Sequence, residues 1–200
     1  MNKFINLIKN NKTLKNGGLF SIFSFFNKGI SFLLLMILAK YISPAQYGFL
    51  SLFNTIVTFL GFTVGLSTAG YLGISYFKNK LAVFKSDLTT IILITTVGSL
   101  LLCILIISLN EWLKHILKLN EILLIIGLYI SFSSIITGLW LDYFRVQEKV
   151  IKYGIISCCN AILNFVLTIY LIRYNNCGWI GFVYSSAICN CLLYTSDAAD

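Results

Sequence analysis

Long apolar stretches alternate with short charged segments along the whole chain. The apolar stretches cover residues 18–41, 49–77, 88–109, 122–141, 151–173 and 178–194. A helix needs roughly 20 mostly apolar residues to cross a hydrocarbon core of about 30 Å. The stretches are continuously apolar, whereas strands of a membrane barrel alternate over about 10 residues. The pattern therefore predicts six transmembrane helices that form one bundle over residues 18–194.

Composition supports a lipid environment for this bundle. Hydrophobic residues make up 58% of the 200 residues and charged residues 11%, and the mean hydropathy is +0.87. A soluble domain carries about a quarter of its residues as charged side chains. Too few charged groups are present to cover a water-exposed surface, so the sequence predicts an all-α integral membrane protein.

The basic residues are distributed unevenly between the two ends of the predicted helices. Ten of the fifteen lysines and arginines fall in residues 1–17 and in the connections after helices two and four, against four on the opposite side. The positive-inside rule therefore predicts a cytoplasmic N-terminus. We expect residues 1–17 to be a basic cytoplasmic lead-in that lies on anionic membrane lipids. The net charge of +8 is explained by this topology, and no basic, aromatic-rich soluble face indicates nucleic-acid binding.

The residues most often used for catalysis or metal binding form no recognisable pattern. The spacing of the six cysteines matches no paired zinc motif, and His115 is the only histidine. Small thiols inside predicted helices are explained by apolar packing. We therefore expect neither a metal site nor a cofactor, and we expect that the protein is not an enzyme.

One lysine lies inside the first predicted helix. Lys28 shares a face with Ser21, Ser24 and Ser31, because their spacing of three, four and three places them within a wedge of about 80°. Asn27 borders that wedge. Lys28 lies about ten residues into the stretch, which is about 15 Å deep and near the middle of the membrane.

A lysine at this depth needs a polar neighbour. Exposing it to lipid costs roughly 2.5–3.5 kcal/mol, and its side chain is too short to reach the membrane surface from the midplane. None of the seven acidic residues falls in mid-helix. This pattern favours a water-filled cavity in which Lys28 meets an anionic ligand; a purely structural role is the alternative.

The second predicted helix carries its own polar face. Asn54, Thr58, Gly61 and Gly65 share it, and the Gly61–Gly65 spacing permits close contact between helices. The glycine-rich and threonine-rich segment predicts either tight packing or a bend that lines a passage. Before this helix, Ser43 and Pro44 suit the cap and the first position of a helix.

Several segments resemble those of a known family. The segment ILAKYISPAQYGFLSLFNTI (residues 37–56) resembles the connection between the first two helices of bacterial polysaccharide flippases. GLSTAGYLGISYF (residues 65–77) is similar to the end of their second helix, and RVQEKVIKY (residues 145–153) to a basic loop. The similarity extends over about residues 15–190. The family belongs to the oligosaccharidyl-lipid/polysaccharide exporter superfamily.

The resemblance implies a fold and a function. It implies two six-helix bundles around a basic cavity, in the cytoplasmic (inner) membrane of a bacterium, with this chain as the N-terminal bundle. The implied activity is translocation of an undecaprenyl-diphosphate-linked oligosaccharide for O-antigen, capsule or exopolysaccharide synthesis, alongside other polysaccharide-assembly proteins. The basic cavity position maps onto Lys28, and more loosely onto Arg145. We expect polar residues on the neighbouring faces to hydrogen-bond the sugar: Asn27, Ser24, Ser31, Asn54 and Thr58.

Two other functions are alternatives to this one. A cation-coupled multidrug exporter of the same superfamily is expected to carry acids within its helices, and none is predicted there. A membrane enzyme of polysaccharide assembly needs a sizeable outer loop, and the outer loops here are short. The final segment, residues 191–200, changes abruptly to small and acidic residues. It resembles translated adapter sequence and suggests a non-native tail on a fragment; a genuine short cytoplasmic tail is the alternative.

Overall fold

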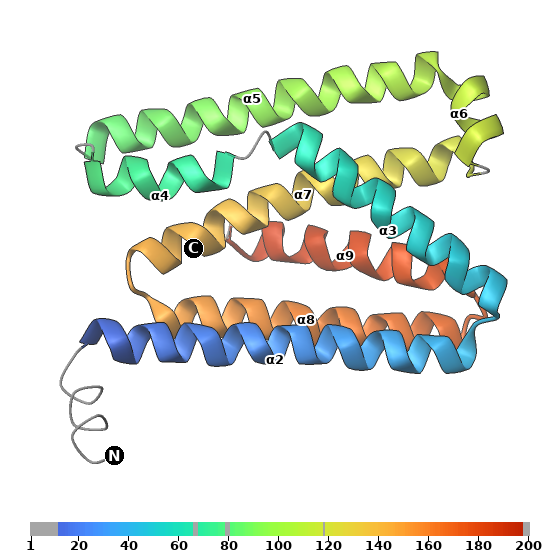
Figure 1. Ribbon diagram of the computed structural model, residues 1–200, viewed down its shortest axis with the longest axis horizontal. Helices are drawn as coiled ribbons and strands as arrows, with labels where there is room; N and C mark the ends of the chain where they lie inside the picture. Colours follow the sequence, from blue (N-terminus) through green and yellow to red (C-terminus); the bar gives the residue numbers. More distant parts are fainter. Residues whose placement is uncertain (1–11, 66–67, 79–80, 118, 198–200) are drawn as a thin grey trace.

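The computed structural model consists of helices joined by short connections (Figure 1). It describes residues 12–65, 68–78, 81–117 and 119–197, and within these ranges the regular elements are all helices. They are α2 (Lys12–Tyr41), α3 (Pro44–Gly65), α4 (Thr68–Lys78), α5 (Leu81–Ser108), α6 (Asn110–Leu117), α7 (Glu121–Val146), α8 (Val150–Arg173) and α9 (Ile180–Asp197). Residues 1–11 of the expected lead-in lie outside the described residues, and Lys12 begins α2.

The prediction of an all-α membrane protein is confirmed. Among the described residues, five helices are long and apolar enough to cross a bilayer, and they are found in α2, α3, α5, α7 and α8. The apolar part of α9, Ile180–Leu192, is shorter than these five. The helix α9 extends through Cys191 to Asp197 and so includes most of the expected tail. The chain is a multi-pass membrane protein.

The second predicted helix, residues 49–77, is wrong as one continuous element. The structure ends α3 at Gly65 and begins α4 at Thr68. Figure 1 shows α3 crossing the molecule obliquely, whereas α4 lies alongside α5. Glycine, serine and threonine are weaker helix formers than alanine or leucine, and the chain changes direction where they are concentrated. A second difference is α6, a short helix inside the segment expected to be an outer loop.

The start of α3 follows from its first residues. The backbone N–H of Gln46 donates to Ser43 Oγ at 3.4 Å, which identifies Ser43 as the cap. Pro44 occupies the first helical position, where its missing N–H costs no hydrogen bond. The prediction from the sequence is confirmed, and the turn between α2 and α3 is reduced to Ile42 and Ser43.

The helices α2 and α8 run parallel to each other. The rings of Phe20 and Tyr153 lie 5.1 Å apart near one end of the pair. Arg173 donates to the Tyr41 hydroxyl at 3.4 Å at the other end. Between these ends, Gly154 leaves room for a ring, because a Cβ there would overlap Phe23. This pairing fixes which face of α2 is covered.

The central helix is α7, which contacts α3, α4, α5, α8 and α9. In its most apolar stretch 33% of the residues are buried, against 11% for α2 at the edge. Gly127 lets α3 approach, since a Cβ there would lie 3.3 Å from Phe53 Cε2. The α3 glycines also face α7, because a Cβ at Gly65 would lie 3.5 Å from Ile135 Cδ1. The packing role predicted for these glycines is therefore confirmed.

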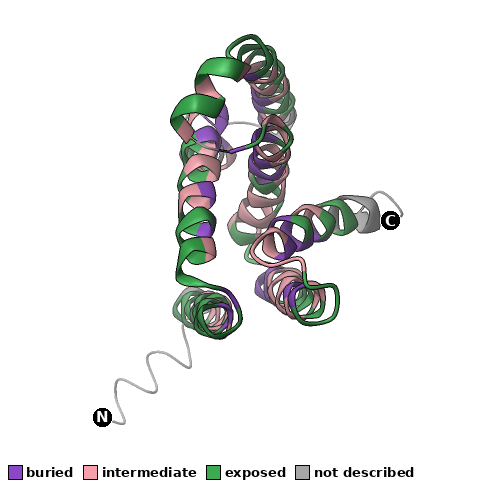
Figure 2. Cartoon of the chain, turned by 90° about the vertical axis from the view of Figure 1, so that its right-hand side faces the viewer, coloured by how far each residue is buried: buried purple, intermediate pink, exposed green. Residues whose placement is uncertain are grey.

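Buried and exposed residues divide each helix lengthwise. Figure 2 shows buried positions on the sides where helices face one another and exposed positions on the outer sides. Many large apolar side chains are exposed on the outer surface, among them Phe25 and Leu100. Such a surface suits contact with lipid, since transmembrane helices bury little hydrophobic area against one another.

A polar groove between α2 and α3

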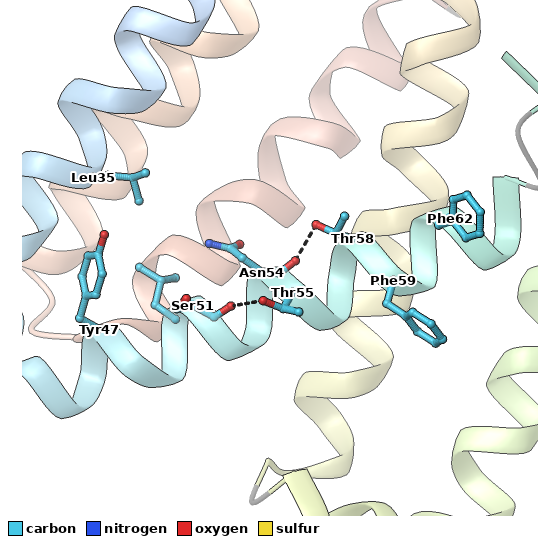
Figure 3. Close-up of a pocket in the computed structure, with 9 residues that line it drawn as sticks. Leu35, Tyr47, Ser51, Asn54, Thr55, Thr58, Phe59 and Phe62 are labelled. Carbon is cyan, nitrogen blue, oxygen red and sulfur yellow. Dashed lines mark hydrogen bonds between the residues drawn. The ribbon is translucent and has the colours of Figure 1, made fainter. Parts of the chain in front are cut away.

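An open groove of about 630 Å³ lies between α2 and α3. Figure 3 shows α3 diverging from α2 along it, with Tyr47 near Leu35 at one end and Phe62 at the other. Leu35 is its lining residue from α2. The other lining residues come from α3: Tyr47, Leu50, Ser51, Asn54, Thr55, Thr58, Phe59 and Phe62. The groove thus combines aromatic rings with a row of hydroxyl and amide groups.

The polar row on α3 exists because the opposite face of this helix is used for packing. Phe53, Val57 and Leu60 point to α7 and the core around it. Ser51, Thr55 and Thr58 are spaced four and three apart, which places them on one face away from that contact. All three are exposed. Because of the helical repeat, the apolar residues of α3 face the core and its polar residues face the groove.

The hydroxyl groups of this row retain the capacity to accept hydrogen bonds. Thr55 Oγ1 donates to the Ser51 carbonyl at 2.9 Å, and Thr58 Oγ1 donates to the Asn54 carbonyl at 2.8 Å (Figure 3). Each bond uses the hydroxyl proton and leaves lone pairs on the oxygen. Asn54 is half-buried in the wall and carries an amide with both a donor and an acceptor. Such a surface can bind hydroxylated ligands.

The polar stripe of α2 lies on the same side of that helix as Leu35. Lys28 precedes the lining residue Leu35 by seven residues, which places the two about 20° apart around the helix and about 10 Å apart along it. Ser24 and Ser31 lie within about 60° of Lys28 on this face. Lys28 and Ser31 are exposed and Ser24 is half-buried. The predicted polar face of α3 therefore lines the groove, whereas that of α2 lies on the Leu35 side of its helix and outside the lining.

Residues of α2 and α3 can be compared by their distance along each helix from the turn that joins the two. Lys28 lies fifteen residues before Ser43 and Thr58 lies fifteen residues after it, so each is about 22 Å along its helix from the turn. Ser31 and Thr55 are matched in the same way. Among the described residues no carboxylate lies within ion-pair distance of Lys28. Its ammonium group is therefore available to an anion that enters the groove.

Of the seven predicted site residues, Asn54 and Thr58 line the groove and the other five lie outside its lining, among them Lys28. Asn27 and Arg145 make other contacts. The Asn27 amide faces α8, where Nδ2 donates to Ser157 Oγ at 3.0 Å. A step of 100° along α2 separates it from Lys28. Arg145 lies at the end of α7, paired with Asp142 at 2.8 Å and placed 5.2 Å over the Tyr153 ring. Its guanidinium also donates to the Tyr153 hydroxyl at 3.2 Å.

A second polar group lies inside the bundle and was not anticipated from the sequence. Thr168 Oγ1 and Ser185 Oγ, both fully buried, are hydrogen-bonded to each other between α8 and α9. Thr168 also donates to Asn164 Oδ1 at 3.1 Å, and Asn164 Nδ2 donates to Ser186 Oγ at 3.3 Å. The sign of this group in the sequence is the four-residue spacing of Asn164 and Thr168, which places both on one face of α8. The polar stripe on α2 has a similar spacing. The two stripes differ in that α9 covers the one on α8.

The chemistry of the groove is that of binding. Its lining holds amide, hydroxyl, phenol and aromatic groups, with one ammonium on the adjoining stripe. Within the described ranges, no three histidine, cysteine, aspartate or glutamate side chains gather as a metal site. Comparisons of the chain with protein-family models, with curated proteins and with solved structures find no match.

Proposed function

We propose that this chain is part of a flippase that moves a lipid-linked oligosaccharide diphosphate across the cytoplasmic membrane of a bacterium. The observation that carries the proposal is Lys28, an exposed lysine on the groove face of a membrane-spanning helix. In this proposal the negative charges of the diphosphate pair with Lys28. The hydroxyl and amide groups of Ser31, Asn54 and Thr58 hydrogen-bond the sugar.

The aromatic residues of the groove add to this proposal. Tyr47, Phe59 and Phe62 expose their rings at the two ends of the polar row. An aromatic ring offers a flat apolar face, and the faces of sugar rings present C–H groups that pack on such a surface. The groove therefore has hydrogen-bonding groups for hydroxyls and rings for the apolar faces of sugars, and in this proposal Lys28 supplies the cation for phosphate.

The distribution of charge supports one orientation for this activity. Lys15, Lys78 and Lys149 lie at the end of the bundle where α2 and α8 begin, together with Arg145 and Lys152. Figure 1 shows these helix ends on one side of the molecule and the turn after α2 on the other. By the positive-inside rule the first side faces the cytoplasm. In the proposed transport cycle, the substrate enters from that side and leaves toward the α2–α3 turn.

A cation-coupled drug exporter fits the groove less well. Exporters of cationic drugs need negative charge in the binding cavity, because like charges repel. The residues that line the groove include no carboxylate, and Lys28 on α2 carries a positive charge. A substrate of negative charge is favoured on electrostatic grounds.

The proposal is tested by Lys28→Ala, introduced into the gene in its native host. Charge-assisted hydrogen bonds contribute about 1.5–3 kcal/mol, so surface polysaccharide is expected to fall on the order of 10- to 100-fold. Lys28→Arg keeps the charge and is expected to retain partial activity. Lys40→Ala, on the same helix near its outer end, is the matched control.

Protein abundance in the membrane is measured beside the polysaccharide in each strain. A loss of polysaccharide in Lys28→Ala at unchanged abundance supports the flippase. Normal polysaccharide in that variant, with the protein present, contradicts it.

A further inference from the structure

The end of the α2–α8 pair carries basic residues from two parts of the chain. Lys15 belongs to the first turns of α2, and Lys149 and Lys152 flank the start of α8. All three are exposed. Lys15 is separated from the other two by more than 130 residues in sequence, and the fold brings α2 and α8 to begin at one end of the molecule.

Specific contacts hold this end together. Asn16, next to Lys15, donates from Nδ2 to Glu148 Oε2 at 3.1 Å. Glu148, next to Lys149, has a φ of +56°, a conformation that turns the chain sharply into α8. One turn further, Phe20 packs edge-on against Tyr153. The lysines are therefore presented by a fixed junction between the two helices.

The position of this junction is at the membrane surface. The apolar span of α2 begins at Leu14, and that of α8 begins at Val150. Lys15 and Lys149 therefore lie where a bilayer places its phosphate groups. Directly below, α8 exposes the apolar side chains of Ile151 and Ile155. This arrangement offers cations for a headgroup and an apolar face for its acyl chains.

We propose that this junction is a binding site for an anionic phospholipid, with the phosphate held by Lys15, Lys149 and Lys152. The site is distinct from the groove, and it does not depend on the proposed transport function. The acyl chains lie along the exposed face of α8. A lipid held there ties the start of α2, which is covered mainly by α8, to the bundle.

The charge balance of the two ends supports a site at this end. At the opposite end of the pair the last turns carry two basic residues, Lys40 on α2 and Arg173 on α8, and Arg173 donates to the Tyr41 hydroxyl. Each lysine near an anionic surface contributes about 1 kcal/mol to binding, which corresponds to about five-fold in affinity. Three lysines in one junction therefore produce a marked preference for anionic over zwitterionic lipid.

Native mass spectrometry of the full chain, purified in an uncharged detergent, tests this proposal. Cardiolipin is titrated as the anionic probe, phosphatidylcholine as the zwitterionic probe, and inorganic pyrophosphate as the soluble phosphate. We expect cardiolipin to remain bound in preference to phosphatidylcholine, and pyrophosphate at equal concentration not to displace it. Displacement by pyrophosphate overturns the lipid site in favour of one for soluble phosphates.

Variants assign the site to the three lysines. Each single change, Lys15→Gln, Lys149→Gln or Lys152→Gln, is expected to lower cardiolipin affinity about five-fold. The triple variant is expected to lose the preference, and the triple arginine variant to retain it. The control, Lys40→Gln with Lys114→Gln, removes two charges from the other end and is expected to bind as the parent does.

If the triple variant does not fold, the three single variants still test whether these lysines bind the lipid. An unchanged affinity in all three single variants overturns the assignment. An equal loss of affinity in the Lys40 and Lys114 control also overturns it, because the effect then follows net charge alone.

Discussion

Two polar regions of this molecule use the same residue types in opposite ways. Between α8 and α9, Asn164, Thr168 and Ser185 hydrogen-bond to one another and are closed off by packing. Between α2 and α3, Asn54, Thr58 and Ser31 line or adjoin an open groove beside an exposed lysine. The first region satisfies its polar groups internally, whereas the second leaves them available.

The difference separates polar groups that stabilise the bundle from polar groups that can bind a ligand. A buried polar group needs a partner because an unsatisfied one costs about 1–3 kcal/mol. The α8–α9 group supplies its own partners and joins the two helices. In the groove, the hydroxyl protons of Thr55 and Thr58 are used by backbone carbonyls, and the oxygen lone pairs remain open to water or a ligand. The two regions are therefore expected to respond differently to substitution.

The largest expected loss of stability comes from Asn164→Leu. The change removes the amide that contacts Thr168, Ser185 and Ser186, and it leaves those hydroxyls with fewer partners. We expect the free energy of unfolding to fall by about 2 kcal/mol. The measurement is an unfolding titration with dodecyl sulfate in mixed micelles. Ser31→Ala, in the open stripe, serves as the control and should change stability by less than about 0.5 kcal/mol. Equal losses in the two variants would remove the distinction between the regions.

A smaller effect, on function instead of stability, is expected for the groove. Asn54→Leu removes a neutral hydrogen-bonding amide from the wall, and such a bond contributes about 1 kcal/mol. Transport, read as surface polysaccharide per unit of membrane protein, is expected to fall about five-fold. The free energy of unfolding should stay close to that of the parent. If Asn54→Leu instead destabilises the protein and leaves transport normal, the groove wall is a packing surface.

The smallest effect is expected for Thr58→Val, which keeps the shape of the side chain. The Thr58 hydroxyl proton is already used by the Asn54 carbonyl, so only the acceptor lone pairs are lost to a ligand. Transport should fall about two-fold, which is less than the loss of one neutral hydrogen bond. A loss as large as that of Asn54→Leu would show that this hydroxyl also donates to the substrate.

Much of the fold could be predicted from residue patterns alone. The lengths of the apolar stretches predicted the spanning helices, and the period of 3.6 predicted the faces that carry Lys28 and Thr58. The turn at Ser43 and Pro44 was also predicted, because cap preferences are local. These features depend on residues within one or two helical turns of each other.

The features that were not predicted depend on neighbours far away in the sequence. The polar stripe on α8 has the same spacing as that on α2, and its burial follows from α9, which no pattern in α8 indicates. Asn27 was grouped with Lys28 because the two are adjacent on a helical wheel. The parallel pairing of α2 with α8 places Asn27 against Ser157 instead. The change of direction between α3 and α4 was one of two outcomes that the glycine-rich segment allowed.

The central claim is that the Lys28 face of α2 meets water and ligand inside the membrane. Its most direct test is the rate at which a membrane-impermeant, charged thiol reagent labels Lys28→Cys in a chain whose six cysteines are replaced by alanine. The matched control is Phe26→Cys. Phe26 is 48% exposed. It lies about 3 Å from Lys28 along the helix axis and about 160° from it around the helix. Our account predicts labelling of Lys28→Cys at least about ten-fold faster, because thiolate forms readily in water and not in lipid. Equal, slow labelling of the two positions would contradict it.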